Sequence, residues 1–319
     1  MEFRIELPKN KPFDVVGLGL NAVDHLTITP EYPPLGSKIL LTDYRLSVGG
    51  QVATAMVALT RLGYRTSYIG KVGAEPLGDL QLSSLESEGV EHSRVIRVEG
   101  ATTQLGFIVI DEHTGERTIF WHRDPRLIVQ PTELDRAHII SGRLLHLDGC
   151  DTDAAIQAAI WAREAGIPVL IDLDTAYPRV EELLPLVDFL IASSEFPAAM
   201  TGKTDRHEAL RKLKEQFGCR FVAMTIGREG ALAYHQEQFF ESPAFTNFDI
   251  SDTTGAGDAF HGGFDYGLLN GFTVEETLTI ANLIAALNCR AIGARAGLPT
   301  TAVLQDAMSD AGLRFRGNN

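Results

Sequence analysis

The sequence predicts an α/β fold with a doubly wound, mostly parallel sheet and a small β-sheet lid. Short apolar runs alternate with helical patterns along the chain, as in buried parallel strands that are joined by helices. Two other segments break this alternation and predict a small separate sheet, because they have strand-like composition and a hairpin turn. A chain of 319 residues is long enough for one large core with such an appendage.

The strands of the main sheet are expected at short apolar runs that polar or turn residues bound on both sides. These runs are 15–18, 144–147, 169–171, 189–191 and 222–224. Val52, Met56 and Leu59 recur at helical spacing, as do the alanines at 155, 159 and 162 before Gly166 ends that helix. The order of strand and then helix after about residue 140 predicts a doubly wound sheet.

The lid strands are predicted within about residues 36–47 and 102–122. Residues 39–46 and 104–110 read as strands, residues 111–116 as a hairpin turn, and residues 117–121 as the returning strand. A lid would exclude water from a reaction site. The alternative is an antiparallel extension that only adds core. No internal repeat or long linker is visible, so we expect a single domain over 1–319.

Charge and cysteine content exclude several classes of protein. The formal net charge of −14 argues against nucleic acid or an anionic membrane as a partner, because either would require a basic face. Cys150, Cys219 and Cys289 are odd in number and widely spaced, which disfavours a disulfide framework or a zinc site. No run of about 18 apolar residues appears, and we expect a cytoplasmic protein.

The run from Asp252 to Gly263, DTTGAGDAFHGG, is where the sequence predicts chemistry. Gly255, Ala256 and Gly257 can turn their backbone N–H groups toward an anion at the start of a helix. Asp258 stands beside this anion pocket and can take a proton from an attacking hydroxyl. A base beside an anion pocket predicts phosphoryl transfer, and the alternative is an ordinary helix with a glycine-rich N-terminus.

This run resembles the C-terminal signature of the ribokinase-like (PfkB) sugar kinases, Asp-Thr-x-Gly-Ala-Gly-Asp-x-Phe, and matches it at every fixed position. Family landmarks recur in order at Gly17-Leu18-Gly19, Gly49-Gly50 and Gly293. The resemblance implies a ribokinase-like, Rossmann-type fold in which Asp258 is the catalytic base and Gly255, Ala256 and Gly257 form the anion hole. It also implies ATP and Mg²⁺ as cofactors and, as in some relatives, K⁺.

The resemblance places sugar-binding residues in the N-terminal half. Asp24 matches the acid of the family's Gly-x-x-x-x-Asp, and a carboxylate can accept hydrogen bonds from two hydroxyls; the alternative is a turn or cap residue. Asn21 is a second candidate. The segment of Gly49, Gly50, Gln51 and Thr54 resembles Gly-Gly-x-x-x-Asn-x-Ala. Thr54 replaces the Asn and has a shorter reach, which leaves the identity of the sugar open.

Two charged residues further along are also candidates. Asp148 follows the 144–147 strand, where open α/β sheets bind ligands and where several sugar kinases carry a hydroxyl-binding acid; the alternative is a helix cap. Arg123 stands where some relatives that act on keto acids place an anion-binding Arg. The alternative for Arg123 is a solvated charge at the rim.

The resemblance also places the nucleotide and metal sites. Thr225, Gly227 and Gly230 match a loop that borders the nucleotide, and Asn282 matches a helix residue near the adenine. The family's Asn-x-x-Glu, which positions water and Mg²⁺, is altered to Ala192-Ser193-Ser194-Glu195-Phe196. If Ser193 is aligned with the family's Asn, Phe196 falls at the position of the Glu. If Glu195 is aligned with the Glu, Ala192 replaces the Asn. The second alignment is favoured, with Glu195 as the residue that organises Mg²⁺. Asp252 and the loop after Ala291 are expected to hold the monovalent cation.

The sequence therefore predicts an ATP-dependent kinase acting on a hydroxyl of a small sugar, of the pentose or ketohexose type. A nucleoside kinase and a 2-keto-3-deoxy sugar-acid kinase remain open within this class. Outside it, a sugar or nucleotide sensor on the same fold would have no need of Asp258. A dehydrogenase is disfavoured because Gly17-Leu18-Gly19 lacks the third Gly of the dinucleotide fingerprint. The resemblance implies a homodimer through the lid sheet.

Overall fold

An eight-stranded sheet forms the centre of the protein, in a computed structural model that describes residues 1–315. Its strand order is β14-β13-β12-β11-β10-β9-β1-β4, with parallel pairing from β4 to β12 and antiparallel pairing at β13 and β14. The strands are β1 Phe13–Leu18, β4 Thr66–Ile69, β9 Gly142–Leu147, β10 Val169–Leu173, β11 Phe189–Ser193, β12 Phe221–Thr225, β13 Ala231–His235 and β14 Gln238–Ser242. The α/β fold and all the predicted main-sheet strands are confirmed.

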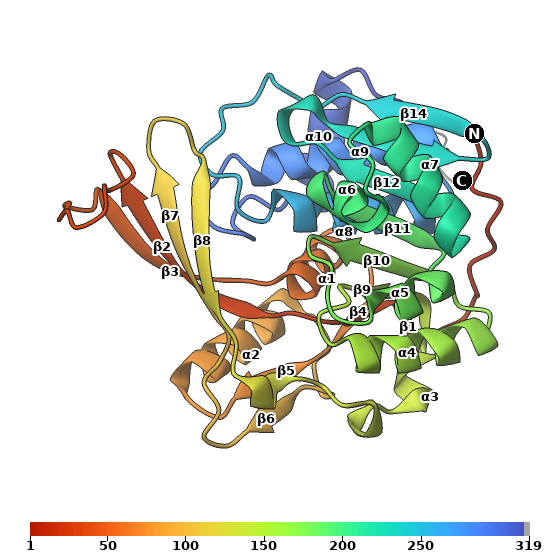
Figure 1. Ribbon diagram of the computed structural model, residues 1–319, viewed down its shortest axis with the longest axis horizontal. Helices are drawn as coiled ribbons and strands as arrows, with labels where there is room; N and C mark the ends of the chain where they lie inside the picture. The colour runs from red at the N-terminus through yellow and green to blue at the C-terminus, as the bar shows by residue number, and fades with distance from the viewer. Residues whose placement is uncertain (316–319) are drawn as a thin grey trace.

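Helices cover both faces of this sheet (Figure 1). Successive strand residues face opposite layers: Leu144 packs in one core cluster and Leu145 in the other, as the period of two requires. One layer contains α1 Gln51–Arg61, α2 Pro76–Glu88, α8 Ala256–Leu269, α9 Val274–Asn288 and α10 Thr301–Asp310. The other contains α3 Arg136–Ile139, α4 Thr152–Glu164, α5 Val180–Leu183, α6 Glu195–Thr201 and α7 Arg206–Phe217.

The strand order reverses at β1. This strand lies between β4 and β9, with α1 on one face of the sheet and α4 on the other. Such a switch point opens a crevice at the carboxyl ends of the strands, where open α/β sheets bind ligands.

A second sheet, the lid, stands beside these carboxyl ends (Figure 1). Its order is β3-β2-β7-β8, with β2 Ala22–Thr29, β3 Asp43–Gly49, β7 Leu105–Asp111 and β8 Arg117–His122. The β7–β8 hairpin was predicted, but the central strand β2 was not, and β3 begins at Asp43 instead of Ile39. Leu26 and Ile28 of β2 pack with Ile108 and Ile110 of β7. The alternation of apolar residues in β2 is therefore a sequence pattern from which this strand could have been predicted.

Short elements complete the chain. They are β5 Lys71–Gly73, which pairs with β6 Ile96–Val98, and the 3₁₀ turns η1 Pro125–Leu127, η2 Pro131–Glu133, η3 Leu184–Leu186 and η4 Gly227–Glu229. Within residues 1–315, no helix has both the length and the apolar character needed to cross a membrane.

Candidate active site

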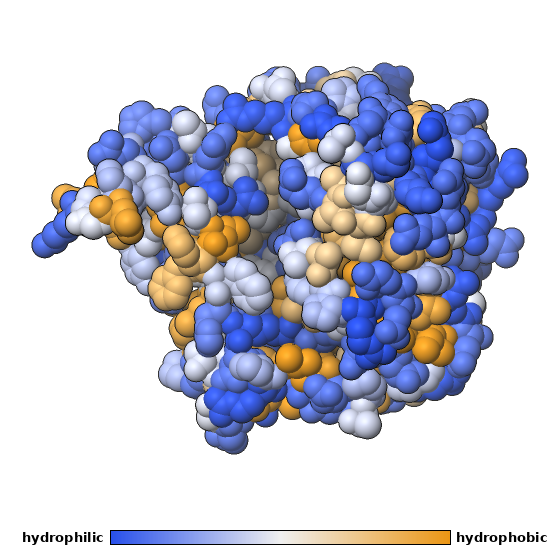
Figure 2. Space-filling view, viewed as in Figure 1, coloured by the Kyte–Doolittle hydropathy of each residue, from blue (hydrophilic) through white to orange (hydrophobic). Residues whose placement is uncertain are grey.

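A cavity of about 920 Å³ lies between the lid and the carboxyl ends of the main strands. Figure 2 shows the hollow between the lid and the body of the molecule. Asp24, Ile119 and Trp121 line it from the lid, and the α8 N-terminus with Asp258 lines it from the body. The structure therefore brings two acids predicted from distant parts of the chain into one cavity.

The anion-hole loop owes its shape to Gly255. This residue has φ 74°, and a Cβ atom there would lie 2.4 Å from the Ala294 carbonyl oxygen. A left-handed residue directly before α8 turns the chain so that the first N–H groups of the helix face the cavity. Gly257 lies within the helix, and nothing stands within 4 Å of its Cβ position. The positive φ and the close Ala294 carbonyl thus require glycine at position 255, whereas a side chain at position 257 would enter open space beside the cavity.

We expect Gly255→Ala to destabilise the protein by at least about 1–2 kcal/mol, the cost of a Cβ in the left-handed region. Gly257→Ala is the matched control, and it should leave the free energy of unfolding unchanged or raise it by up to about 1 kcal/mol, because Ala is the better helix former. Urea unfolding of both variants measures the difference. Equal stability of the two would contradict a special role for Gly255.

Asp258 occupies the first turn of α8, half-buried and beside the anion hole. Burial raises its pKa to about 6, and the nearby Asp174 carboxylate acts in the same direction. Arg117, Arg295 and His146 oppose this rise. A carboxylate with this pKa is mostly ionised at neutral pH and can accept a proton from a bound hydroxyl.

His261, one turn after Asp258, was not predicted. Its Nδ1–H donates to the Gly257 carbonyl oxygen at 2.6 Å. Burial and the neighbouring His146 lower the pKa of His261 to about 3, so the ring is neutral. This hydrogen bond restrains the Gly257 peptide, which is part of the predicted anion hole.

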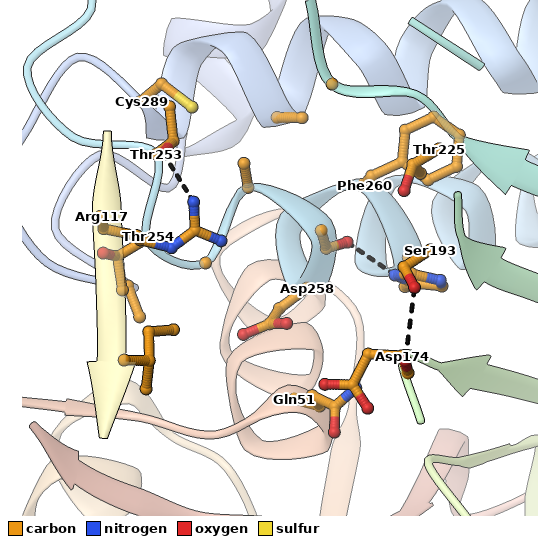
Figure 3. A pocket seen from close by; sticks show the side chains of 18 of the residues that line it. Gln51, Arg117, Asp174, Ser193, Thr225, Thr253, Thr254, Asp258, Phe260 and Cys289 are labelled. Atoms are coloured by element: carbon orange, nitrogen blue, oxygen red, sulfur yellow. Dashed lines mark hydrogen bonds between the residues drawn. The ribbon is translucent and has the colours of Figure 1, made fainter. Parts of the chain in front are cut away.

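Arg117 is a second residue that the sequence did not single out. It projects from β8 of the lid, lines the cavity, and donates from Nη1 to Thr253 Oγ1 at 2.7 Å (Figure 3). Thr253 belongs to the anion-hole loop, so this bond connects the lid to the phosphate side of the cavity. A guanidinium here adds positive charge beside the predicted phosphate site.

Asp24 lies in strand β2 and not in a turn. Its buried carboxylate lies against two glycines: Cβ atoms at Gly49 and Gly106 would come within 2.3 Å and 2.5 Å of its oxygens. Burial raises the pKa of Asp24 to about 7, and the Arg295 charge opposes this rise. Asp24 lines the cavity, so its predicted role as a hydroxyl acceptor has the required position.

Asn21, Gly49 and Thr54 lie behind the cavity wall, whereas Gly50 and Gln51 line it. The buried Arg295, not predicted, donates to Thr54 Oγ1 at 3.2 Å, to Asn21 Oδ1 at 3.0 Å and to the Gly49 carbonyl oxygen. Burial lowers the pKa of Arg295 to about 10, which still leaves it charged. Direct sugar contacts at Asn21, Gly49 and Thr54 are therefore not supported, and these residues anchor the base of the lid.

Two further expectations need correction. Asp148 does not line the cavity. Its carboxylate accepts hydrogen bonds from the Leu20 amide at 2.6 Å and from the Cys150 amide at 3.0 Å. Arg123 is also absent from the cavity wall and pairs with the buried Asp151 at 2.8 Å. Both charged groups are thus held by partners within the protein, and neither lines the cavity.

The predicted nucleotide residues all line the cavity; they are Ser193, Thr225, Gly227, Gly230 and Asn282. Gly230 has φ 102°, and a Cβ there would meet the Ser242 carbonyl oxygen at 2.0 Å. The Asn282 amide donates to the same carbonyl at 2.9 Å. Phe245 and Ala285 add apolar surface on this side, as a nucleobase would require.

The predicted metal residues do not reach the cavity. Glu195 is exposed at the start of α6 and accepts a hydrogen bond from Ser194 Oγ at 3.3 Å. Asp252 is buried, with Oδ1 accepting from the Thr254 amide at 2.8 Å and Oδ2 from the Gly293 amide at 2.9 Å. Asp252 therefore connects two loops. Asp172 and Asp174 line the cavity from the main sheet, in addition to Asp258 and to Asp24 and Glu116 of the lid.

Comparison with known proteins agrees with this geometry. The profile of the pfkB family carbohydrate kinases matches residues 18–301. An ATP-dependent ribose-1-phosphate kinase of Halopiger xanaduensis is 32% identical over 85% of this chain and 90% of its own length. A probable chloroplastic fructokinase-6 of Arabidopsis thaliana is 27% identical over 87% of this chain and 79% of its own. The crystal structure of a putative ribokinase from Agrobacterium tumefaciens superposes with a TM-score of 0.85 at 26% identity, covering 95% of this chain and 99% of its own. The chain belongs to the pfkB family of carbohydrate kinases, and it is a sugar kinase with an alcohol group as acceptor.

Proposed function

We propose that the protein transfers the γ-phosphoryl group of ATP to a hydroxyl of a small sugar of the pentose or ketohexose type. The observation that carries this proposal is the shared cavity, in which Asp24 on the lid faces Asp258 at the N-terminus of α8. One acid can hold hydroxyls while the other takes a proton. Ribose-1-phosphate, fructose and 5-dehydro-2-deoxygluconate are acceptors implied by the names of relatives.

In this mechanism Asp24 orients the acceptor and Asp258 removes the proton from the attacking hydroxyl. The N–H groups at Gly255–Gly257 and the Arg117 guanidinium stabilise negative charge on the transferred group. Bound Mg²⁺ supplies further neutralisation of the phosphate oxygens. We also propose K⁺ near Asp252, whose bond to the Gly293 amide places the two loops of that site together.

A nucleoside acceptor is the second candidate, favoured by Trp121 and Ile119 on the lid wall of the cavity. Arg123, on which the sugar-acid alternative rested, is paired with Asp151, but relatives named as 5-dehydro-2-deoxygluconokinases keep a sugar acid among the candidate acceptors. A sensor would bind ligands without turnover. ADP release with MgATP, measured over pentoses, ketohexoses, their 1-phosphates, sugar acids and nucleosides, tests these candidates. Ligand binding without ADP release from any acceptor would contradict the proposal.

The pH dependence of kcat should report the ionisation of Asp258. Because burial raises its pKa to about 6, the base is protonated below that pH and kcat should fall as the pH decreases through about 6. Arg117 lowers this pKa, so Arg117→Met should move the acidic limb to higher pH. Rates at saturating substrates over pH 4.5–8 would show both effects. An acidic limb that does not move in the variant would contradict the influence of Arg117.

We propose a homodimer through the outer face of the lid sheet. The register aligns Leu46, His25, Phe107 and Phe120 in one row across the four strands. Leu46 is 45%, Phe107 47% and Phe120 54% exposed, and a patch of this kind is typical of an interface. Phe107→Asp should give a monomer by light scattering, whereas Ile160→Asp on the exposed side of α4 should not. A monomeric wild type would overturn the proposal.

A further inference from the structure

The ion that accompanies ATP requires oxygen ligands beside the transferred phosphoryl group, and β10 supplies two acids at that place. Asp172 and Asp174 stand at the carboxyl end of this strand and line the same cavity as Gly257 and Asp258. We propose that Asp172 and Asp174 hold the Mg²⁺ of the nucleotide complex, in place of Glu195. This inference rests on the proposed ATP-dependent function.

Asp172 carries the observation that points to a cation. Its side chain is only 4% exposed, and its Oδ2 has no hydrogen-bond partner. His261 Nδ1 lies 3.2 Å away, but this nitrogen donates to the Gly257 carbonyl oxygen. A buried carboxylate oxygen without a donor is costly. A cation entering from the cavity would satisfy it.

Asp174 provides an exposed carboxylate beside this buried one. It stands in the bend directly after β10, two residues beyond Asp172, and lines the same cavity. Figure 3 shows the Asp174 carboxylate next to Gln51 and directed toward Asp258. The Ser193 hydroxyl donates to the Asp174 carbonyl oxygen at 3.4 Å, which restrains this segment against β11.

The altered Asn-x-x-Glu segment offers no carboxylate to the cavity. Ala192 has no oxygen in its side chain, and the exposed Glu195 does not line the cavity. Among residues 1–315, no three His, Cys, Asp or Glu side chains converge on one point. Two carboxylates suffice for Mg²⁺, because this ion keeps several waters and phosphate oxygens when it is bound with a nucleotide.

Titration of Mn²⁺, followed by electron paramagnetic resonance with ADP present, tests the assignment without turnover. Asp172→Asn and Asp174→Asn should each weaken Mn²⁺ affinity by at least about 10-fold, on the scale of lost metal contacts. Metal-free ADP affinity should change by less than about threefold. Glu195→Gln is the matched control and should behave as wild type. Asp174 is exposed, so its variant should fold normally.

The outcomes separate this inference from the kinase assignment. A wild type that binds neither ADP nor its Mn²⁺ complex would contradict the ATP-dependent function. A wild type that binds both, with unchanged Mn²⁺ affinity in the Asp174→Asn variant, would overturn the β10 metal site. Weaker Mn²⁺ binding in Glu195→Gln alone would return the role to Glu195.

Discussion

Asp258→Asn is expected to lower kcat by on the order of 10²–10⁴, the usual contribution of a positioned general base. Asn has nearly the same size as Asp and cannot accept the hydroxyl proton. ATP and sugar should still bind, because the anion hole at Gly255–Gly257 and the sugar acid Asp24 are unchanged. Steady-state kinetics give kcat, and calorimetric titration gives the two affinities.

A suitable control for this variant is Asp306→Asn, which changes an exposed Asp on α10 outside the cavity. Its kcat should equal that of the wild type. A folded Asp258→Asn enzyme that keeps more than about a tenth of wild-type turnover would mean that another group takes the proton.

Asp24→Ala is expected to remove roughly 2–4 kcal/mol of transition-state stabilisation for the true sugar. Hydrogen bonds to charged groups contribute about 1.5–3 kcal/mol each, and truncation admits water to the subsite. The loss should concern the sugar alone. ATP affinity depends on the other side of the cavity, around Gly227 and Gly255, and should change by less than about threefold.

Titration of ATP and of the best sugar into the Asp24→Ala variant tests both statements. Asp24→Asn is a useful companion, since it keeps the volume that Gly49 and Gly106 accommodate. If the affinities for ATP and sugar weakened equally, Asp24 would have a structural role. If neither changed, it would not contact the acceptor.

Much of the fold could be predicted because its signals are local. Five buried parallel strands of the main sheet, β1, β9, β10, β11 and β12, are short apolar runs and were predicted where the structure has them, whereas β4, β13 and β14 were not predicted. Strand β2 was not predicted, and it follows β1 after only a few residues. Its place in the lid depends on pairing with β3 and β7, and β7 is distant in the sequence.

The residues of the candidate site also fall into two groups, those that local sequence predicts and those that only tertiary contacts reveal. The sequence by itself predicts a phosphate side, because a glycine at positive φ, the N–H groups of a helix and Asp258 are neighbours in the chain. It also placed Asp24, through the family resemblance. It could not distinguish Asp148 and Arg123 from cavity residues, since only tertiary contacts occupy them with the Leu20 amide and with Asp151.

Only the tertiary structure decided which other groups share the cavity. Arg117 of the lid donates a hydrogen bond to Thr253 in the loop before α8, and Arg295 joins the base of the lid to α1. One oxygen of the Asp172 carboxylate has no hydrogen-bond partner. The physical reason is that a charge acquires its role from what surrounds it after folding. Burial and long-range pairing decide whether a carboxylate caps a loop, pairs with an arginine or remains available to a ligand.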